Sequence, residues 1–100
     1  MPAELILEFT GVTLAEYRAV NNELGIDPDS GEGAWPDGMV SHAAGLTDDG
    51  RLVVLEVWDT PEHQAAFLEE RLGEALAKGG IEGPPSSVTW IELATHQHLR

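Results

Sequence analysis

The chain has 100 residues, 42% hydrophobic and 23% charged, which is the composition of one ordinary folded domain. With 5 basic and 18 acidic residues it carries a net charge of -13, which repels nucleic-acid phosphates and anionic membrane surfaces. There is no apolar run of the ~20 residues that span a bilayer, no cysteine and no secretion signal, so we expect one cytoplasmic domain over residues 1–100 that contacts neither nucleic acid nor membrane.

A strand and then a helix are predicted in the first quarter of the chain. Apolar and polar residues alternate over 4–9, the period of a strand. Thr13 and Glu16 match a capping box, and an apolar stripe of helical period continues until Gly25, where a helix would end. Asn21 falls inside that stripe. We expect its side chain to bond to nearby backbone rather than to a ligand.

Residues 26–38 form a long acidic segment that contains prolines and glycines and is predicted to be a loop. Loops longer than ~12 residues are uncommon in small domains and often serve as lids or binding loops. Trp35 is the aromatic side chain of this loop. It can pack over the mouth of a pocket, against a neighbouring chain or onto the edge of the sheet, and we count it as a candidate substrate contact.

The middle of the chain predicts two strands joined by a tight turn, and then a helix. Residues 39–46 and 52–58 are the strands, and the residues 47–50 between them include the aspartates and glycine of a hairpin turn. Thr60 is placed to cap a helix over 61–78. The buried stripe predicted for this helix is Ala65, Leu68, Leu72, Ala75 and Leu76, with Phe67 beside it.

A last strand over 88–93 completes the order βαββαβ. Two right-handed βαβ halves predict an α+β, ferredoxin-like domain, with a four-stranded antiparallel sheet and both helices on one face. Period two predicts that the helix side of the sheet holds Leu5, Leu7, Phe9, Val53, Leu55, Val57, Ile91 and Leu93. The opposite side would hold Ile6, Glu8, Val40, His42, Leu52, Val54, Glu56, Trp58, Val88 and Trp90. Because that second set is largely apolar, we expect another copy of the chain to cover it in a homodimer.

The order and spacing of several short motifs resemble the dimeric α/β-barrel superfamily, which includes antibiotic-biosynthesis monooxygenase-like domains, and within it small actinobacterial proteins. The motifs are Tyr17-Arg18-Ala19-Val20-Asn21 with Leu24-Gly25, Asp37-Gly38 before His42, Asp48-Asp49-Gly50 before Val57-Trp58-Asp59-Thr60, and Phe67 with Leu72. The resemblance covers nearly the whole chain and implies a dimeric α/β barrel with an internal cavity. It does not fix the chemistry, because members include cofactor-independent oxygenases, haem-degrading enzymes, cyclases, isomerases and ligand-sensing modules. The haem-degrading branch is less similar, since its first-strand asparagine has no counterpart between Glu4 and Phe9.

His42 is the best candidate for chemistry, because a mid-strand histidine can act as general acid or base near neutral pH. A purely structural histidine tied to Glu8 or Glu56 is the equal alternative. The two glutamates share a predicted face, where they are either a proton-transfer pair or ordinary ion-paired acids. Trp58 and Trp90 can stack on a flat aromatic ligand or simply fill a core or interface.

The sequence predicts no cofactor and no metal site. It has no phosphate loop, dinucleotide glycine pattern or serine-nucleophile elbow, and His96 with His98 lacks a third metal ligand at recognisable spacing. Two hypotheses for the function remain. One is a cofactor-independent monooxygenase-like or related proton-transfer enzyme acting on a small flat aromatic or polyketide-like molecule, with His42 as base. The other is a non-catalytic homodimer, either ligand-binding or structural.

Overall fold

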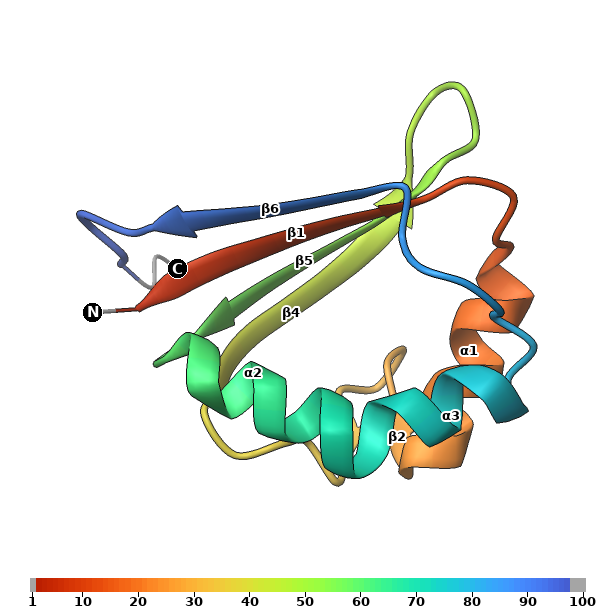
Figure 1. The fold of residues 1–100 in the computed structure, drawn as a ribbon, viewed down its shortest axis with the longest axis horizontal. Helices are drawn as coiled ribbons and strands as arrows, with labels where there is room; N and C mark the ends of the chain where they lie inside the picture. Colours follow the sequence, from red (N-terminus) through yellow and green to blue (C-terminus); the bar gives the residue numbers. More distant parts are fainter. Residues whose placement is uncertain (1, 98–100) are drawn as a thin grey trace.

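The computed structural model describes residues 2–97, and its main feature is a four-stranded antiparallel sheet with helices along one side (Figure 1). The sheet order is β4-β5-β1-β6, which is the ferredoxin-like α+β arrangement that the sequence predicts. Its strands are β1 (Ala3–Phe9), β4 (Met39–Leu46), β5 (Leu52–Trp58) and β6 (Ser87–Glu92). The helical side contains α1 (Leu14–Leu24), α2 (Pro61–Phe67), a π-helical turn (Leu68–Leu72) and α3 (Gly73–Lys78).

The predicted helix boundaries are confirmed by their caps. Thr13 and Glu16 form a reciprocal capping box at the start of α1, and Gly25 ends that helix in the left-handed conformation at φ 76°. The Thr60 hydroxyl accepts a hydrogen bond from the backbone N–H of His63 at the start of α2. These local signals fix where each helix begins, and they therefore fix which side chains it turns toward the sheet.

The second helical segment is not a continuous α-helix. The π-helical turn Leu68–Leu72 holds one residue more than an α-helical turn would, so the stripe that faces the sheet shifts around the axis. As a result Phe67, which the sequence pattern places beside the stripe, is buried against Leu5 and Trp58. Leu68, assigned to the stripe, is 43% exposed.

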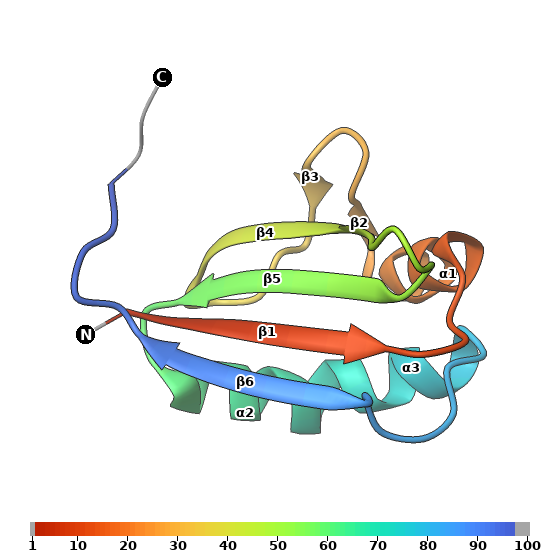
Figure 2. The ribbon, with the colours of Figure 1, turned by 90° about the horizontal axis from the view of Figure 1, so that it is seen from above.

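The predicted loop over residues 26–38 contains a short hairpin. Its strands are β2 (Ile26–Asp27) and β3 (Glu32–Gly33), seen in Figure 2 beside β4 at the edge of the main sheet. Ile26 is buried, and the Ala34 backbone N–H donates to the Gly25 carbonyl oxygen at 3.0 Å. The segment is therefore anchored at both ends rather than free.

The predicted faces of β5 and β6 are wrong. Leu5, Leu7 and Phe9 of β1 do face the helices, and in the register they lie opposite Glu56, Val54 and Leu52 of β5. Directly opposed residues share a face of the sheet. The helix side therefore also holds Leu52, Val54, Glu56, Trp58, Val88 and Trp90, all assigned above to the other side. Val53, Leu55, Val57 and Ile91 lie on the open face instead, and Leu93 falls beyond β6.

The face predicted for His42 is wrong for the same reason. His42 lies opposite Glu56 on β5 and so points toward the helices, whereas Ser41 lies opposite Val57 on the open face. A β-bulge between Met39 and Ser41 shifts the register of β4, so that Met39 and His42, three residues apart, both turn to the helix side.

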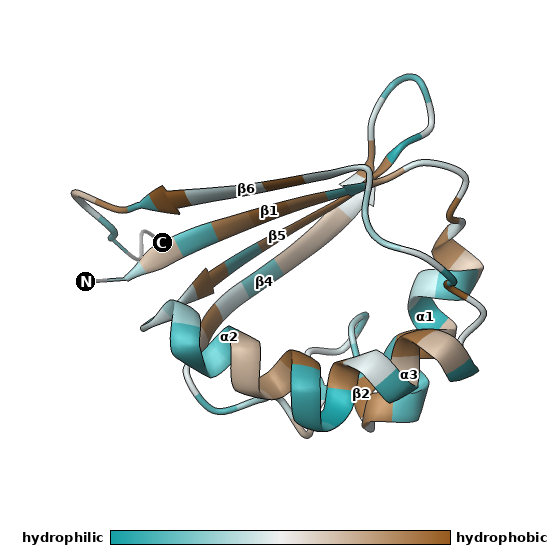
Figure 3. Cartoon of the chain, viewed as in Figure 1, coloured by the Kyte–Doolittle hydropathy of each residue, from teal (hydrophilic) through white to brown (hydrophobic). Residues whose placement is uncertain are grey.

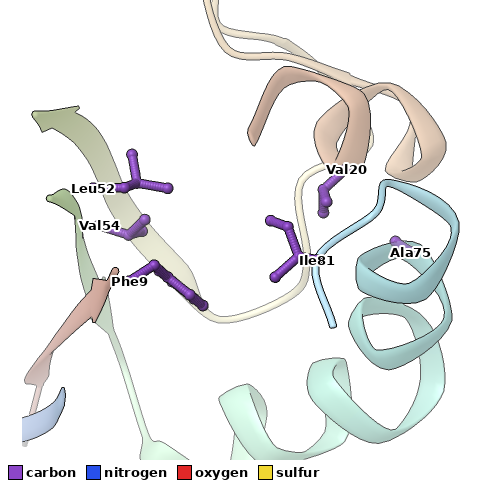
Figure 4. Close-up of a cluster of buried hydrophobic side chains, with 6 residues drawn as sticks. All are labelled: Phe9, Val20, Leu52, Val54, Ala75 and Ile81. Atoms are coloured by element: carbon purple, nitrogen blue, oxygen red, sulfur yellow. The ribbon is translucent and has the colours of Figure 1, made fainter. Parts of the chain in front are cut away.

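The apolar core lies between the sheet and the helices in two clusters. Figure 4 shows one of them, in which Phe9, Leu52 and Val54 on the sheet face Val20 and Ile81 on the helical side. The other cluster is Leu5, Trp58 and Phe67, near the opposite end of the strands. No helix within residues 2–97 is long and apolar enough to cross a membrane.

Candidate functional site

A cavity of about 430 Å³ lies between the helical layer and the sheet. This volume is within the range of small-molecule sites in proteins. Its walls come from all four strands of the sheet, from α1 and from the second helical segment, and are almost entirely apolar. Among the described residues, the polar side chains that line it are Tyr17, Asn21, His42, Glu56 and Gln64, with the indoles of Trp35 and Trp90.

His42 stands at the centre of a hydrogen-bonded chain in this cavity. Its Nδ1 lies 3.2 Å from Glu56 Oε2, and its Nε2 lies 2.6 Å from the hydroxyl of Tyr17 on α1. The second carboxylate oxygen of Glu56 accepts the Trp58 indole N–H at 3.1 Å. The side chains of His42 and Glu56 are only 12% and 8% exposed, so water competes little for these bonds.

The chain of bonds fixes where the protons are when the imidazole is neutral. An ionised carboxylate can only accept, so the proton of the ring lies on Nδ1 and is donated to Glu56. Nε2 then accepts from the Tyr17 hydroxyl, whose oxygen keeps lone pairs that can accept from a bound molecule. A proton can therefore pass from a ligand through Tyr17 to His42, where the neighbouring carboxylate stabilises the imidazolium.

Tyr17 holds its own proton firmly. Burial raises the pKa of its phenol above the ordinary 10.0, the Asn21 side chain opposes that rise, and the negative charge of Glu56 adds to it. Asn21 also donates from its Nδ2 to the backbone carbonyl of Tyr17 at 2.9 Å, as expected for a buried asparagine tied to nearby backbone. The phenol is thus protonated at neutral pH, and its hydroxyl is bonded to His42.

Trp35 and Trp90, both candidate ligand contacts, line the cavity. The Trp35 ring centroid lies 5.3 Å from that of His42, at an interplanar angle of 51°, and its indole N–H donates to the Gly31 carbonyl oxygen. The Tyr17 ring lies nearly parallel to the imidazole, with centroids 6.0 Å apart. His42 is therefore enclosed by two aromatic rings.

Trp58 and Glu8, the two other candidate site residues, do not line the cavity. Trp58 is fully buried against Leu5 and Phe67 and is not among the lining residues, so it positions Glu56 rather than forming a wall. Glu8 lies on the open face of the sheet and is paired with Arg51. It is separated by the sheet from His42 and Glu56, so the structure does not bring the two glutamates together.

The sequence pattern does not identify Tyr17 as a site residue. It places Tyr17 in the apolar stripe of α1 and in the motif 17–21, and helical period alone cannot distinguish a core tyrosine from a functional one. The feature that could have identified Tyr17 is chemical: a phenol hydroxyl inside a helix stripe needs a hydrogen-bond partner, and His42 can supply one.

No group of three or more metal-binding side chains occurs among residues 2–97, and His98 lies outside the described residues.

Comparison with solved structures places this architecture among known folds. A proposed antibiotic biosynthesis monooxygenase from Chloroflexus aurantiacus J-10-fl superposes with a TM-score of 0.66 at 18% identity, covering 97% of this chain and 98% of that one. The protein Rv0793 from Mycobacterium tuberculosis superposes with a TM-score of 0.67 at 18% identity, covering 98% of this chain and 100% of that one. No protein-family model and no curated protein matches the sequence. The chain therefore has the fold of antibiotic biosynthesis monooxygenase-like proteins over nearly its whole length.

Proposed function

We propose that the protein is a cofactor-independent monooxygenase-type enzyme that removes a proton from a small, flat hydroxyaromatic molecule and passes the resulting anion to oxygen. The observation that carries the proposal is the partly buried Tyr17–His42–Glu56 chain at one end of an apolar cavity. The fold shared with a proposed antibiotic biosynthesis monooxygenase supports it.

The reaction balances with oxygen as the only oxidant. The phenol loses its proton through Tyr17 to His42, and the phenolate transfers an electron to O₂. The radical pair then joins at the para carbon and takes back a proton, which forms a hydroperoxide. Loss of the para C–H proton with cleavage of the O–O bond gives a quinone and one water. The apolar walls keep bulk water away from the anion while this happens.

The test uses α-naphthol in air-saturated buffer, with oxygen uptake and quinone absorbance followed together. We expect one O₂ consumed per naphthoquinone formed, and a kcat about 10²- to 10⁴-fold lower in His42→Gln, which is the range for loss of a general base. His63→Gln is the matched control, because His63 lies at the exposed start of α2, outside the cavity lining. Equal rates in the two variants would disprove His42 as the base.

One observation favours a second candidate, a binding protein without turnover. Both ring nitrogens of His42 and both oxygens of Glu56 already have partners within the protein. Because these buried polar groups are already hydrogen-bonded to one another, the arrangement is stable without a catalytic role. Quenching of tryptophan fluorescence by α-naphthol with no oxygen uptake would identify this candidate as correct.

A further inference from the structure

The cavity reaches from one edge of the sheet to the other. His42 lies on β4 and Trp90 on β6, which are the two edge strands, with β5 and β1 between them (Figure 1). Three strand spacings of ~4.8 Å separate these edges, a distance of about 14 Å. A cavity of about 430 Å³ with that span is long rather than round.

The two ends of the cavity differ in polarity and in exposure. At the β4 end, His42 and Glu56 are nearly buried, and the rings of Tyr17 and Trp35 enclose the imidazole. At the β6 end the lining side chains are apolar and open to solvent, with Leu68 43%, Val88 55% and Trp90 39% exposed. The cavity is therefore closed at its polar end and open at its apolar end.

The charge of the lining restricts the ligand further. No lysine or arginine among the described residues lines the cavity, whereas Glu56 does. A carboxylate placed at the closed end would be desolvated beside that acid without a cation to balance it. The free lone pairs on the Tyr17 oxygen instead suit a neutral hydrogen-bond donor such as a hydroxyl group.

We infer that the ligand is an elongated, uncharged molecule with a single hydroxyl end. The hydroxyl donates to the Tyr17 oxygen at the closed end, the apolar body crosses the sheet over β5 and β1, and the far end emerges between Leu68, Val88 and Trp90. Along this path the strands carry apolar lining residues, and Figure 3 colours much of their ribbon brown for hydrophobic. The inference rests on the site of the proposed function and names its substrate class, but it requires no turnover.

The test measures binding of a series of para-alkylphenols, from ethyl to dodecyl, by calorimetry at neutral pH. We expect affinity to rise by about fourfold per added methylene, the value for burying one CH₂. The rise should stop once the molecule exceeds about 14 Å, the estimated width of the sheet. A para-alkylbenzoate of matched length should bind at least tenfold more weakly than the phenol, as should the alkylbenzene that lacks a hydroxyl.

Variants at the open end distinguish binding along the cavity from non-specific binding of apolar molecules. Trp90→Ala should weaken binding of para-octylphenol several-fold and leave para-ethylphenol unchanged, because only the long ligand reaches β6. Ile91→Ala is the matched control, since Ile91 is similarly exposed but lies on the opposite face. Affinity that is independent of chain length, tighter binding of the benzoate, or an equal effect of Trp90→Ala on both phenols would overturn the inference.

These outcomes can be told apart from those of the oxygen assay. Length-dependent binding of the para-alkylphenols, together with no oxygen uptake on α-naphthol, would leave this inference standing and remove the proposed enzyme activity. Rapid oxidation of α-naphthol, with an affinity for the para-alkylphenols that does not rise with chain length, would support the enzyme activity and overturn the inference of an elongated ligand.

Discussion

Tyr17 is the only tyrosine in the chain, so its ionisation can be followed without interference from another phenol. Because burial raises the pKa of Tyr17, we expect the near-ultraviolet absorbance change of the phenolate to have its midpoint above pH 10.0. Tyr17→Phe should show no such transition. A midpoint at or below 10.0 in the folded protein would contradict the buried placement of the hydroxyl beside His42.

The same pKa shift fixes the sign of a stability change. The folded-state pKa of Tyr17 is higher than the unfolded one, so its contribution to stability is complete below pH 10.0 and is lost as pH rises through the folded value. We expect the melting temperature to fall more steeply with alkaline pH in the wild type than in Tyr17→Phe. Parallel curves for the two proteins would show that the phenol titrates alike in both states.

At the scale of single residues, the sequence names candidate residues by their type but does not place them. His42, Glu56, Trp35 and Trp90 line the cavity, and their roles in binding or catalysis stay predictions. Glu8 does not join them, because it lies on the open face as predicted, whereas Glu56 lies on the helix side of β5 against the prediction. Candidate residues can be named from their type. Which of them lie together depends on the register of the strands, because a shift of one residue moves every side chain of a strand to the other face.

Among the elements, Arg71 of the π-helical turn connects three parts of the molecule. Its Nη2 donates to the carbonyl oxygens of Leu24 at 3.0 Å and of Ala34 at 2.8 Å, and its guanidinium lies 5.4 Å from the centroid of the Phe67 ring. It thus caps the end of α1 and holds the backbone next to Trp35. The π turn matters because it sets where this side chain projects.

We expect Arg71→Met to loosen the segment 26–35 while leaving the rest of the fold intact. Hydrogen bonds to charged groups contribute about 1.5–3 kcal/mol, so amide exchange in this segment should speed up by ten-fold or more. Mass spectrometry of hydrogen exchange measures this directly. Arg18→Met is the matched control, because Arg18 reaches the same segment only through an exposed ion pair with Asp29 and should change exchange little. Equal exchange in both variants would show that Arg71 is not the anchor.

The elements themselves were predictable because their signals are local. The caps at Thr13 and Thr60 and the hairpin turn before Gly50 each act within a few residues, and all three form. The faces of β5 were not predictable, because six of its seven residues are apolar and the strand gives little polar contrast to orient it. The bulge in β4 adds a second unknown, since it depends on pairing with β5 rather than on its own residues.

At the scale of the whole molecule, the helices cover one side of the sheet and leave its other side, the open face, without a helical layer (Figure 1). The corrected register places Ile6, Val53, Leu55 and Ile91 there, with Leu55 38% and Ile91 42% exposed. Ser41, Ala43 and Gly45 of β4 add a strip of small side chains on the same face, over which another surface can approach closely. The reason for expecting a homodimer, an apolar open face, therefore still holds. The residues that make this face apolar are different from the predicted ones.

We therefore predict a homodimer that buries this open face. Leu55→Glu should dissociate it, because the substitution places a charge in the middle of the apolar patch, which two copies would have to desolvate together. Val88→Glu is the matched control. It puts the same charge on the same sheet but on the helix side, so the dimer should persist. Light scattering at micromolar concentration should give about twice 10.8 kDa for the wild type and for Val88→Glu, and 10.8 kDa for Leu55→Glu. A wild-type protein that is wholly monomeric and still has a normal stability of about 0.1 kcal/mol per residue would show that the face is stable in water without a partner.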